Sequence, residues 1–106
     1  MVLGIYQEVD NSVSAQEADV IVYSAKMCSD CQILKKWCDD RGVKYETRDI
    51  RENLEYGVEL EKETGKLGVP YLKFEDEWIR GYDLTGPFTD AFIQEIFDRK
   101  GVVYSK

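Results

Sequence analysis

The sequence predicts one α/β domain in which a four-stranded mixed sheet is flanked by helices. Residues 20–23 form an apolar, mostly β-branched run, and a helical pattern of apolar residues follows a few positions later. Residues 43–50 alternate with period two, as a second strand does. Residues 71–80 contain two short strand-like runs around an acidic turn, which is typical of a β-hairpin.

The first strand and helix follow from these patterns. Residues 20–24 suit a central strand that is buried on both faces. The helix is expected from just after Cys28 to about Arg41, with Gly42 at its C-terminal cap. The residues predicted on its inward face are Ile33, Leu34, Trp37 and Cys38.

A second strand at residues 43–50, reached through that helix, implies a right-handed βαβ crossover. A second helix is expected from about Asn53 to Thr64, with Gly65 as its stop. The residues predicted to point inward from this helix are Leu54, Val58 and either Tyr56 or Leu60.

The last part of the chain is predicted as a loop, a hairpin and a helix. Residues 68–74 lead into a third strand, and residues 78–80 return as a fourth. The last helix is expected from Pro87 to about Arg99, because proline suits the first helical turn. Its predicted buried stripe is Phe88, Phe92, Ile93, Ile96 and Phe97.

Length and charge narrow the functional classes. The chain has 106 residues, which suits one domain: residues 1–19 as an N-terminal extension or added strand, and 20–106 as the domain proper. The net charge of −7 argues against nucleic acid and anionic membranes as partners. The absence of histidine excludes Cys–His pairs and histidine metal sites. No signal peptide or membrane span is visible, so we expect a cytoplasmic protein. We also expect a monomer.

The segment Cys28-Ser29-Asp30-Cys31 is a C-x-x-C motif at the junction of the first strand and helix, which indicates thiol redox chemistry. Cys28 would stand at the helix N-terminus, where free N–H groups and the helix dipole favour a thiolate. Cys31 would lie one turn further on, close enough to form a disulfide. In a reducing compartment such a pair is catalytic, redox-sensing or metal-binding rather than structural.

Three segments follow one another along the chain: Tyr23 followed by Cys28-Ser29-Asp30-Cys31, then Gly68-Val69-Pro70, and Ile79-Arg80-Gly81-Tyr82-Asp83. With these segments in this order, residues 20–99 resemble the glutaredoxins, which have the thioredoxin fold. Gly68-Val69-Pro70 is similar to the family's Thr-Val-Pro, and the segment from Ile79 to Asp83 is similar to its glycine–aspartate loop. The chain departs from the family pattern at Ser29-Asp30, where Pro-Tyr is common, and at Gly68.

The resemblance implies roles for these residues. Cys28 attacks a target disulfide, and Cys31 resolves the mixed disulfide or is bypassed in a monothiol mechanism. Asp30 is expected to oppose the thiolate and make the dithiol a better reductant. The Val69–Pro70 bond is implied to be cis, whereas the residues alone would also suit a trans proline at the start of an edge strand. The residues implied to contact substrate are Lys26, Val69, Pro70, Arg80, Gly81, Tyr82 and Asp83.

Three classes of function remain open. The first is an electron-transport enzyme that reduces protein disulfides or glutathione mixed disulfides, with either glutathione as co-substrate or thioredoxin reductase as electron source. The second is a module that binds a [2Fe–2S] cluster between two copies through Cys28 and glutathione. The third is a thioredoxin-fold adaptor without turnover. We expect no resident metal, because the third cysteine, Cys38, falls on the predicted core face as a buried hydrophobe.

Overall fold

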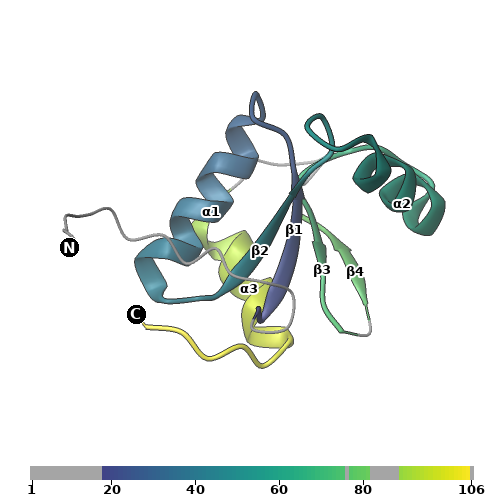
Figure 1. The fold of residues 1–106 in the computed structure, drawn as a ribbon. Helices are drawn as coiled ribbons and strands as arrows, with labels where there is room; N and C mark the ends of the chain where they lie inside the picture. The colour runs from purple at the N-terminus through teal and green to yellow at the C-terminus, as the bar shows by residue number, and fades with distance from the viewer. Residues whose placement is uncertain (1–17, 76, 82–88, 106) are drawn as a thin grey trace, which may run out of the picture.

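The described residues, 18–75, 77–81 and 89–105 of the computed structural model, form a four-stranded sheet with three helices (Figure 1). The elements in chain order are β1 (Val20–Ser24), α1 (Ser29–Arg41), β2 (Tyr45–Asp49), α2 (Leu54–Thr64), β3 (Tyr71–Lys73), β4 (Trp78–Arg80) and α3 (Asp90–Arg99). This order confirms the predicted one. The predicted N-terminal extension falls almost wholly outside the described residues, as do Pro87 and Phe88.

The sheet has the strand order β2-β1-β3-β4, and it is mixed as predicted. Strand β1 runs parallel to β2, with Val20 opposite Tyr45, and antiparallel to β3, with Val22 opposite Leu72. Strand β4 pairs antiparallel with β3 and completes the hairpin. Strand β1 therefore lies inside the sheet, which explains its apolar sequence.

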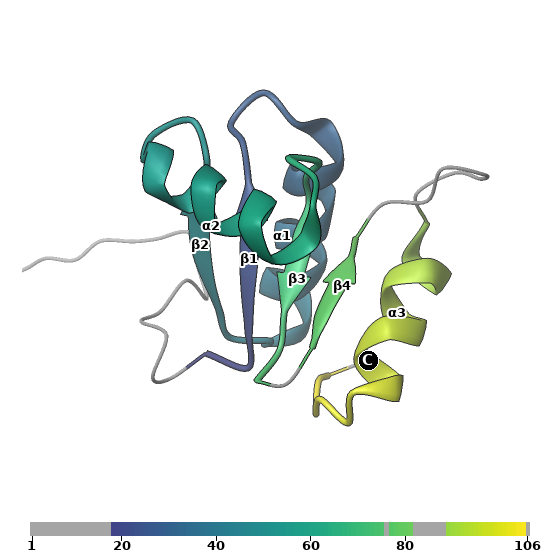
Figure 2. The same ribbon diagram turned by 90° about the vertical axis from the view of Figure 1, so that its right-hand side faces the viewer.

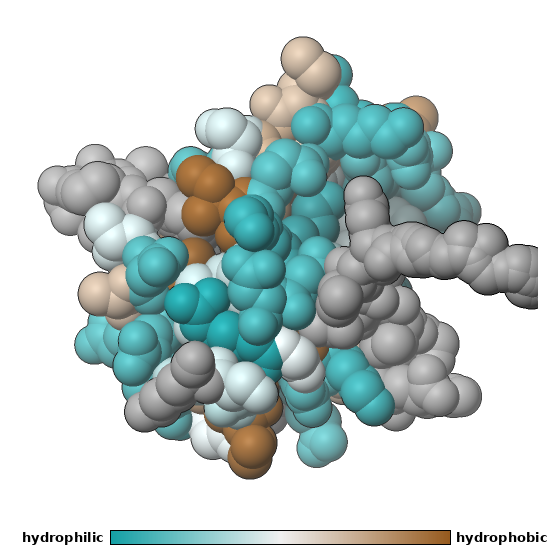
Figure 3. Space-filling view, turned by 90° about the vertical axis from the view of Figure 1, so that its left-hand side faces the viewer, coloured by the Kyte–Doolittle hydropathy of each residue, from teal (hydrophilic) through white to brown (hydrophobic). Residues whose placement is uncertain are grey.

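Helices α1 and α3 cover one face of the sheet, here called the α1/α3 face, and α2 covers the other, the α2 face (Figures 1 and 2). The α1/α3 face carries the main apolar core. The Trp37 and Phe97 rings stack there with centroids 5.2 Å apart and so join α1 to α3. The outward surface of this layer is mostly hydrophilic (Figure 3). The core residues that the sheet, α1 and α3 contribute include Val20, Val22, Leu34, Trp37, Cys38, Leu72, Ile79, Ile93, Ile96 and Phe97.

Local sequence signals explain where the helices begin and end. Gly42 and Gly65 follow α1 and α2 with φ of 75° and 80°, a left-handed conformation that glycine adopts without strain. The side chain of Asn53 accepts a hydrogen bond from the Glu55 N–H and caps α2. Thr89 caps α3 in the same way, so α3 begins after a cap at residue 89.

The α2 face is held by a network of charged and aromatic side chains. The buried Tyr23 hydroxyl donates to Glu59 Oε1 at 2.6 Å and accepts from Arg48 Nη1 at 2.9 Å. Arg48 also forms ion pairs with Glu46 and Glu59. Burial, with the Glu59 hydrogen bond, raises the pKa of Tyr23 well above its ordinary value. Since Glu59 belongs to α2, this network ties α2 to β1 and β2.

Two residues predicted to point inward from α2 are exposed instead. Leu54 is 76% exposed and Val58 is 66% exposed, whereas Leu60 is fully buried. Ile33 of α1 is likewise 44% exposed. Helical spacing had correctly placed Leu54 and Val58 on one face, but that face lines an open groove. Spacing identifies a shared face without identifying what the face meets.

Candidate active site

Cys28 is the N-cap residue of α1, as predicted. Its Sγ accepts a hydrogen bond from the Cys31 N–H at 3.1 Å, and its side chain is half-buried. Cys31 is fully buried one turn into the helix, and a disulfide joins the two. When the pair is reduced, this N–H and the α1 dipole both favour a thiolate on Cys28. Cys28 is therefore the accessible sulfur of the pair.

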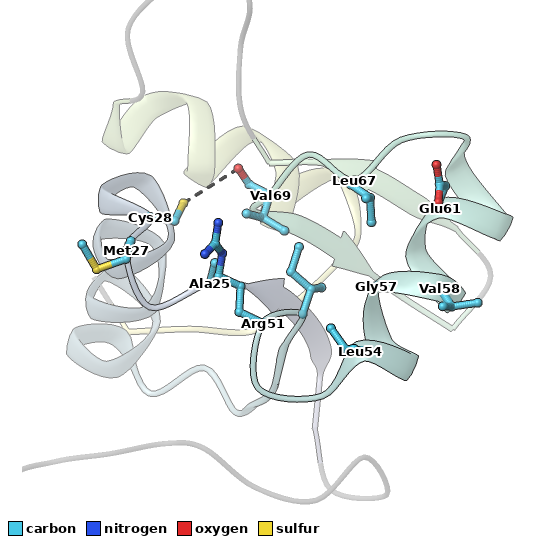
Figure 4. A pocket seen from close by; sticks show the side chains of 11 residues that line it. Ala25, Met27, Cys28, Arg51, Leu54, Gly57, Val58, Glu61, Leu67 and Val69 are labelled. Atoms are coloured by element: carbon cyan, nitrogen blue, oxygen red, sulfur yellow. Dashed lines mark hydrogen bonds between the residues drawn. The ribbon is translucent and has the colours of Figure 1, made fainter.

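The loop before β3 brings Val69 and Pro70 to the same place. The Val69–Pro70 peptide bond is cis, which confirms the geometry implied by the resemblance. The Val69 carbonyl oxygen lies 3.8 Å from Cys28 Sγ, although the two residues are 41 positions apart (Figure 4). The structure therefore places a backbone acceptor directly beside the accessible sulfur.

Gly81 is connected to this loop. Its N–H donates to the Pro70 carbonyl oxygen at 2.9 Å. A Cβ at position 81 would lie 3.0 Å from that oxygen and 3.3 Å from Leu72 Cδ1, closer than side chains normally approach. Glycine therefore permits the end of β4 to lie against the Val69–Pro70 loop.

The remaining residues predicted to contact substrate are placed less directly. Lys26 is exposed and pairs with Glu52 at 2.7 Å, so its charge is already engaged by a carboxylate. Arg80 is exposed at the end of β4, opposite Tyr71 in the ladder. Tyr82 and Asp83 lie outside the described residues. The members of the predicted set that the structure gathers at one place are Cys28, Cys31, Val69, Pro70 and Gly81.

A groove of about 750 Å³ opens beside Cys28, between α2 and the loop before β3 (Figure 4). Most of its lining is apolar. The lining residues from the segment around the cysteine are Ala25, Met27 and Cys28; those from β2 to α2 are Ile50, Arg51, Leu54, Gly57, Val58 and Glu61; and Leu67 and Val69 complete it. The groove would present the accessible Cys28 sulfur to a ligand that is largely apolar.

Sequence reasoning missed several groove residues, above all Arg51 and Glu61. Arg51 follows the end of β2, and its guanidinium extends toward the Cys28 end of the groove (Figure 4). One signal was available, because β1 and β2 were expected to be parallel. The carboxyl ends of adjacent parallel strands meet at one edge of a sheet, where ligands bind in open α/β folds. Glu61 had no such signal and resembled any other solvated acidic residue of its helix.

Cys38, the third cysteine, lies in the core as predicted and is fully buried. Burial raises the pKa of its thiol to about 12, so at neutral pH it is a thiol and a poor nucleophile. Within the described part of the chain, no three side chains of the metal-binding types gather at one point. None of the helices in that part combines the length and hydropathy that a membrane span needs.

Comparison with known proteins agrees with this geometry. The family model described as Glutaredoxin matches residues 20–79, more than half of the chain. No curated protein matches the chain in sequence.

Solved structures are similar in fold. A glutaredoxin from Archaeoglobus fulgidus is 18% identical, with a TM-score of 0.58 over 77% of this chain and 85% of that one. The glutaredoxin-like NrdH-redoxin from Escherichia coli is 17% identical, with a TM-score of 0.56 over 73% of this chain and 92% of that one. A wheat glutaredoxin is 24% identical, with a TM-score of 0.54 over 74% of this chain and 82% of that one. At these identities the likeness establishes the thioredoxin-like fold and confirms the predicted fold class.

Proposed function

The chain belongs to the glutaredoxin family, and from this we propose that it is a thiol–disulfide oxidoreductase that reduces protein disulfides and glutathione mixed disulfides. One observation carries the proposal: Cys28 caps α1 with its sulfur at the mouth of the groove, within disulfide distance of Cys31. A structural disulfide would not need an accessible sulfur beside a ligand-sized groove.

The proposed reaction has two exchange steps. The Cys28 thiolate attacks one sulfur of the substrate disulfide, the substrate S–S bond breaks, and the other substrate sulfur leaves as a thiolate that takes up a proton. The Cys31 thiolate then attacks the Cys28 sulfur and releases the second substrate thiol. Two electrons pass to the substrate, and the protein is left with the Cys28–Cys31 disulfide.

The surroundings of Cys28 would tune the first step. The Cys31 N–H and the amino end of α1 stabilise the thiolate, while the Val69 carbonyl can accept a hydrogen bond from the protonated thiol. Asp30, in the first turn of α1, adds a negative charge that disfavours the thiolate. We therefore expect Asp30→Asn to speed alkylation of Cys28 at neutral pH, and an unchanged rate would exclude this role.

Two electron donors compete in the proposal, both available in the cytoplasm where thiols are kept reduced. Glutathione as the electron donor is supported by the chain's membership of the glutaredoxin family. It is also supported by Arg51, a cation at the groove that could pair with a glutathione carboxylate. Thioredoxin reductase is supported by the exposed apolar side chains of Leu54 and Val58, since protein partners bury such surface. The Escherichia coli NrdH-redoxin, similar in fold, is described as having a thioredoxin-like activity profile.

The test is turnover of a glutathione mixed disulfide and of a protein disulfide, each with the two donors in parallel. Cys28→Ser should abolish turnover of both substrates. Cys31→Ser should abolish turnover of the protein disulfide. Turnover of the glutathione mixed disulfide should persist in this variant only if a monothiol route operates. Cys38→Ala serves as the matched control, because it removes a cysteine from the core without touching the groove. Wild-type protein that turns over neither substrate with either donor would refute the proposed function.

A further inference from the structure

The groove beside Cys28 has a wall made by one side of α2. Leu54, Gly57, Val58 and Glu61 line it and follow the spacing i, i+3, i+4, i+7, so they share one face of the helix. Gly57 keeps the floor open. A Cβ there would lie 3.5 Å from Leu67 Cδ2 and 3.7 Å from the Ile50 Cβ, so a longer side chain would fill the space between them. The groove therefore extends along the helix away from Cys28.

The two ends of this groove carry opposite charges. The Arg51 side chain extends toward the Cys28 end of the groove, and Glu61 lies on the opposite side of the view, three positions after Val58 on α2 (Figure 4). Among the residues that the structure describes, neither side chain has a hydrogen bond or ion pair. Lys26 and Glu52, also near the cysteine, neutralise each other instead. The groove is thus positive near Cys28, apolar in the middle and negative at its far end.

The length of the α2 wall fits a short extended peptide. Leu54 and Glu61 are seven positions apart on α2, which corresponds to about 10 Å at the helical rise. An extended chain covers that distance in about three residues. Glutathione has only a glycine after its cysteine, so on that side it is shorter than the three extended residues that span this wall.

We propose that this groove selects protein disulfides in which the target cysteine is flanked by an acidic residue, then apolar residues, then a basic residue about three positions further on. The acidic side chain pairs with Arg51, the apolar residues cover Leu54 and Val58, and the basic side chain pairs with Glu61. This inference rests on the proposed function, since it concerns the substrate that reaches Cys28.

The test is a single turnover that needs no electron donor. Pre-reduced protein is mixed with a symmetric disulfide of a short peptide, and peptide thiol release is followed by acid quenching and mass spectrometry. One peptide has the order cysteine, aspartate, leucine, leucine, lysine, and the second exchanges the aspartate and the lysine. Each peptide is also made with its residue order reversed, so that the cysteine is the last residue. Their identical composition and net charge cancel the general repulsion by this acidic protein.

Wild-type protein should reduce the first pattern about tenfold faster than the second in one chain direction, the size expected when two exposed ion pairs are exchanged for two like-charge contacts. Arg51→Glu combined with Glu61→Lys should invert this preference. The matched control is Lys62→Glu with Glu63→Lys, an equal exchange of exposed charges on the same helix outside the groove. It should retain the wild-type preference.

Equal rates for both patterns in both directions would overturn the inference and leave the proposed oxidoreductase standing. A preference that the Arg51/Glu61 exchange leaves unchanged would overturn it as well. If wild-type protein reduces none of the peptides, the inference fails. The proposed function fails with it only when the protein disulfide and the glutathione mixed disulfide are not reduced either.

Discussion

The two faces of the sheet are built in different ways. On the α1/α3 face, two helices cover an apolar core in which Leu34 is 1% exposed and the Trp37 and Phe97 rings stack. On the α2 face, one helix is attached through the hydrogen-bonded network of Tyr23, Arg48 and Glu59. The outer stripe of that helix, with Leu54 at 76% exposure, lines the groove beside Cys28.

The contrast assigns stability mainly to one face of the sheet and the groove to the other. Buried apolar area contributes most of the folding free energy, so the α1/α3 face should dominate stability. A helix held by specific polar contacts needs fewer apolar residues against the sheet. Its remaining apolar residues are then free to line a groove. Four experiments test this division of roles.

The largest expected effect comes from the same substitution on the two faces. Leu34→Ala should lower the free energy of unfolding by about 3 kcal/mol, because it leaves a cavity in the core. Leu54→Ala should lower it by less than about 0.5 kcal/mol, because Leu54 is exposed. Urea unfolding followed by circular dichroism measures both. Similar losses for the two variants would contradict the division.

Tyr23→Phe should cost about 1–3 kcal/mol, because it removes the hydroxyl that joins Glu59 and Arg48 at a buried position. Tyr104→Phe is the matched control. Its hydroxyl donates to Asp98 at 2.6 Å on the exposed surface, so its loss should cost less than about 0.5 kcal/mol. If Tyr23→Phe unfolds at the wild-type urea midpoint, the network does not hold α2.

Alkaline pH should weaken the core through Cys38. The folded pKa of about 12 lies above the unfolded value, roughly 8.5, so the unfolded state loses its proton first. The stabilising contribution is therefore complete below about pH 8.5 and is lost as pH rises toward 12, at about 1.4 kcal/mol per pH unit. Urea midpoints of oxidised wild type and Cys38→Ala at pH 8 and pH 10.5 check this. The urea midpoint of the wild type should fall more steeply with pH than that of Cys38→Ala. Parallel pH profiles of the two midpoints would contradict this role of Cys38.

Gly57→Ala should have the smallest effect on stability, a gain of up to about 1 kcal/mol from helix propensity. The new Cβ would make ordinary contacts with Leu67 and Ile50, so the helix can accept it. The same methyl group enters the groove and should slow the reduction of peptide disulfides. A raised urea midpoint with an unchanged peptide rate would mean that the groove floor does not contact substrate.

The sequence was sufficient for the features that local signals specify. Gly42 and Gly65 marked helix ends because few other residues adopt their backbone conformation without strain. The C-x-x-C spacing placed Cys28 at the start of α1, and the family resemblance placed Val69 beside it. Each of these rests on a few adjacent residues or on a recognisable motif.

The features that it missed depend on how distant segments pack. The apolar spacing of Leu54 and Val58 is the same whether their face meets the sheet or an open groove. Arg51 and Glu61 come to line one groove only when α2 lies beside the loop before β3. No periodicity in the chain encodes the hydrogen bond between Tyr23 and Glu59, 36 positions apart.

The placement of the two tryptophans gives the molecule a built-in optical reporter for each face. Trp37 stacks on Phe97 in the core, while Trp78 lies on the α2 face with its ring 5.1 Å from that of Tyr23. Emission from Trp37 therefore follows the α1/α3 layer, and emission from Trp78 follows the layer that carries the groove. In a variant that keeps only one of them, Trp37→Phe or Trp78→Phe, motion of the remaining tryptophan's layer can be recorded by fluorescence without any added label.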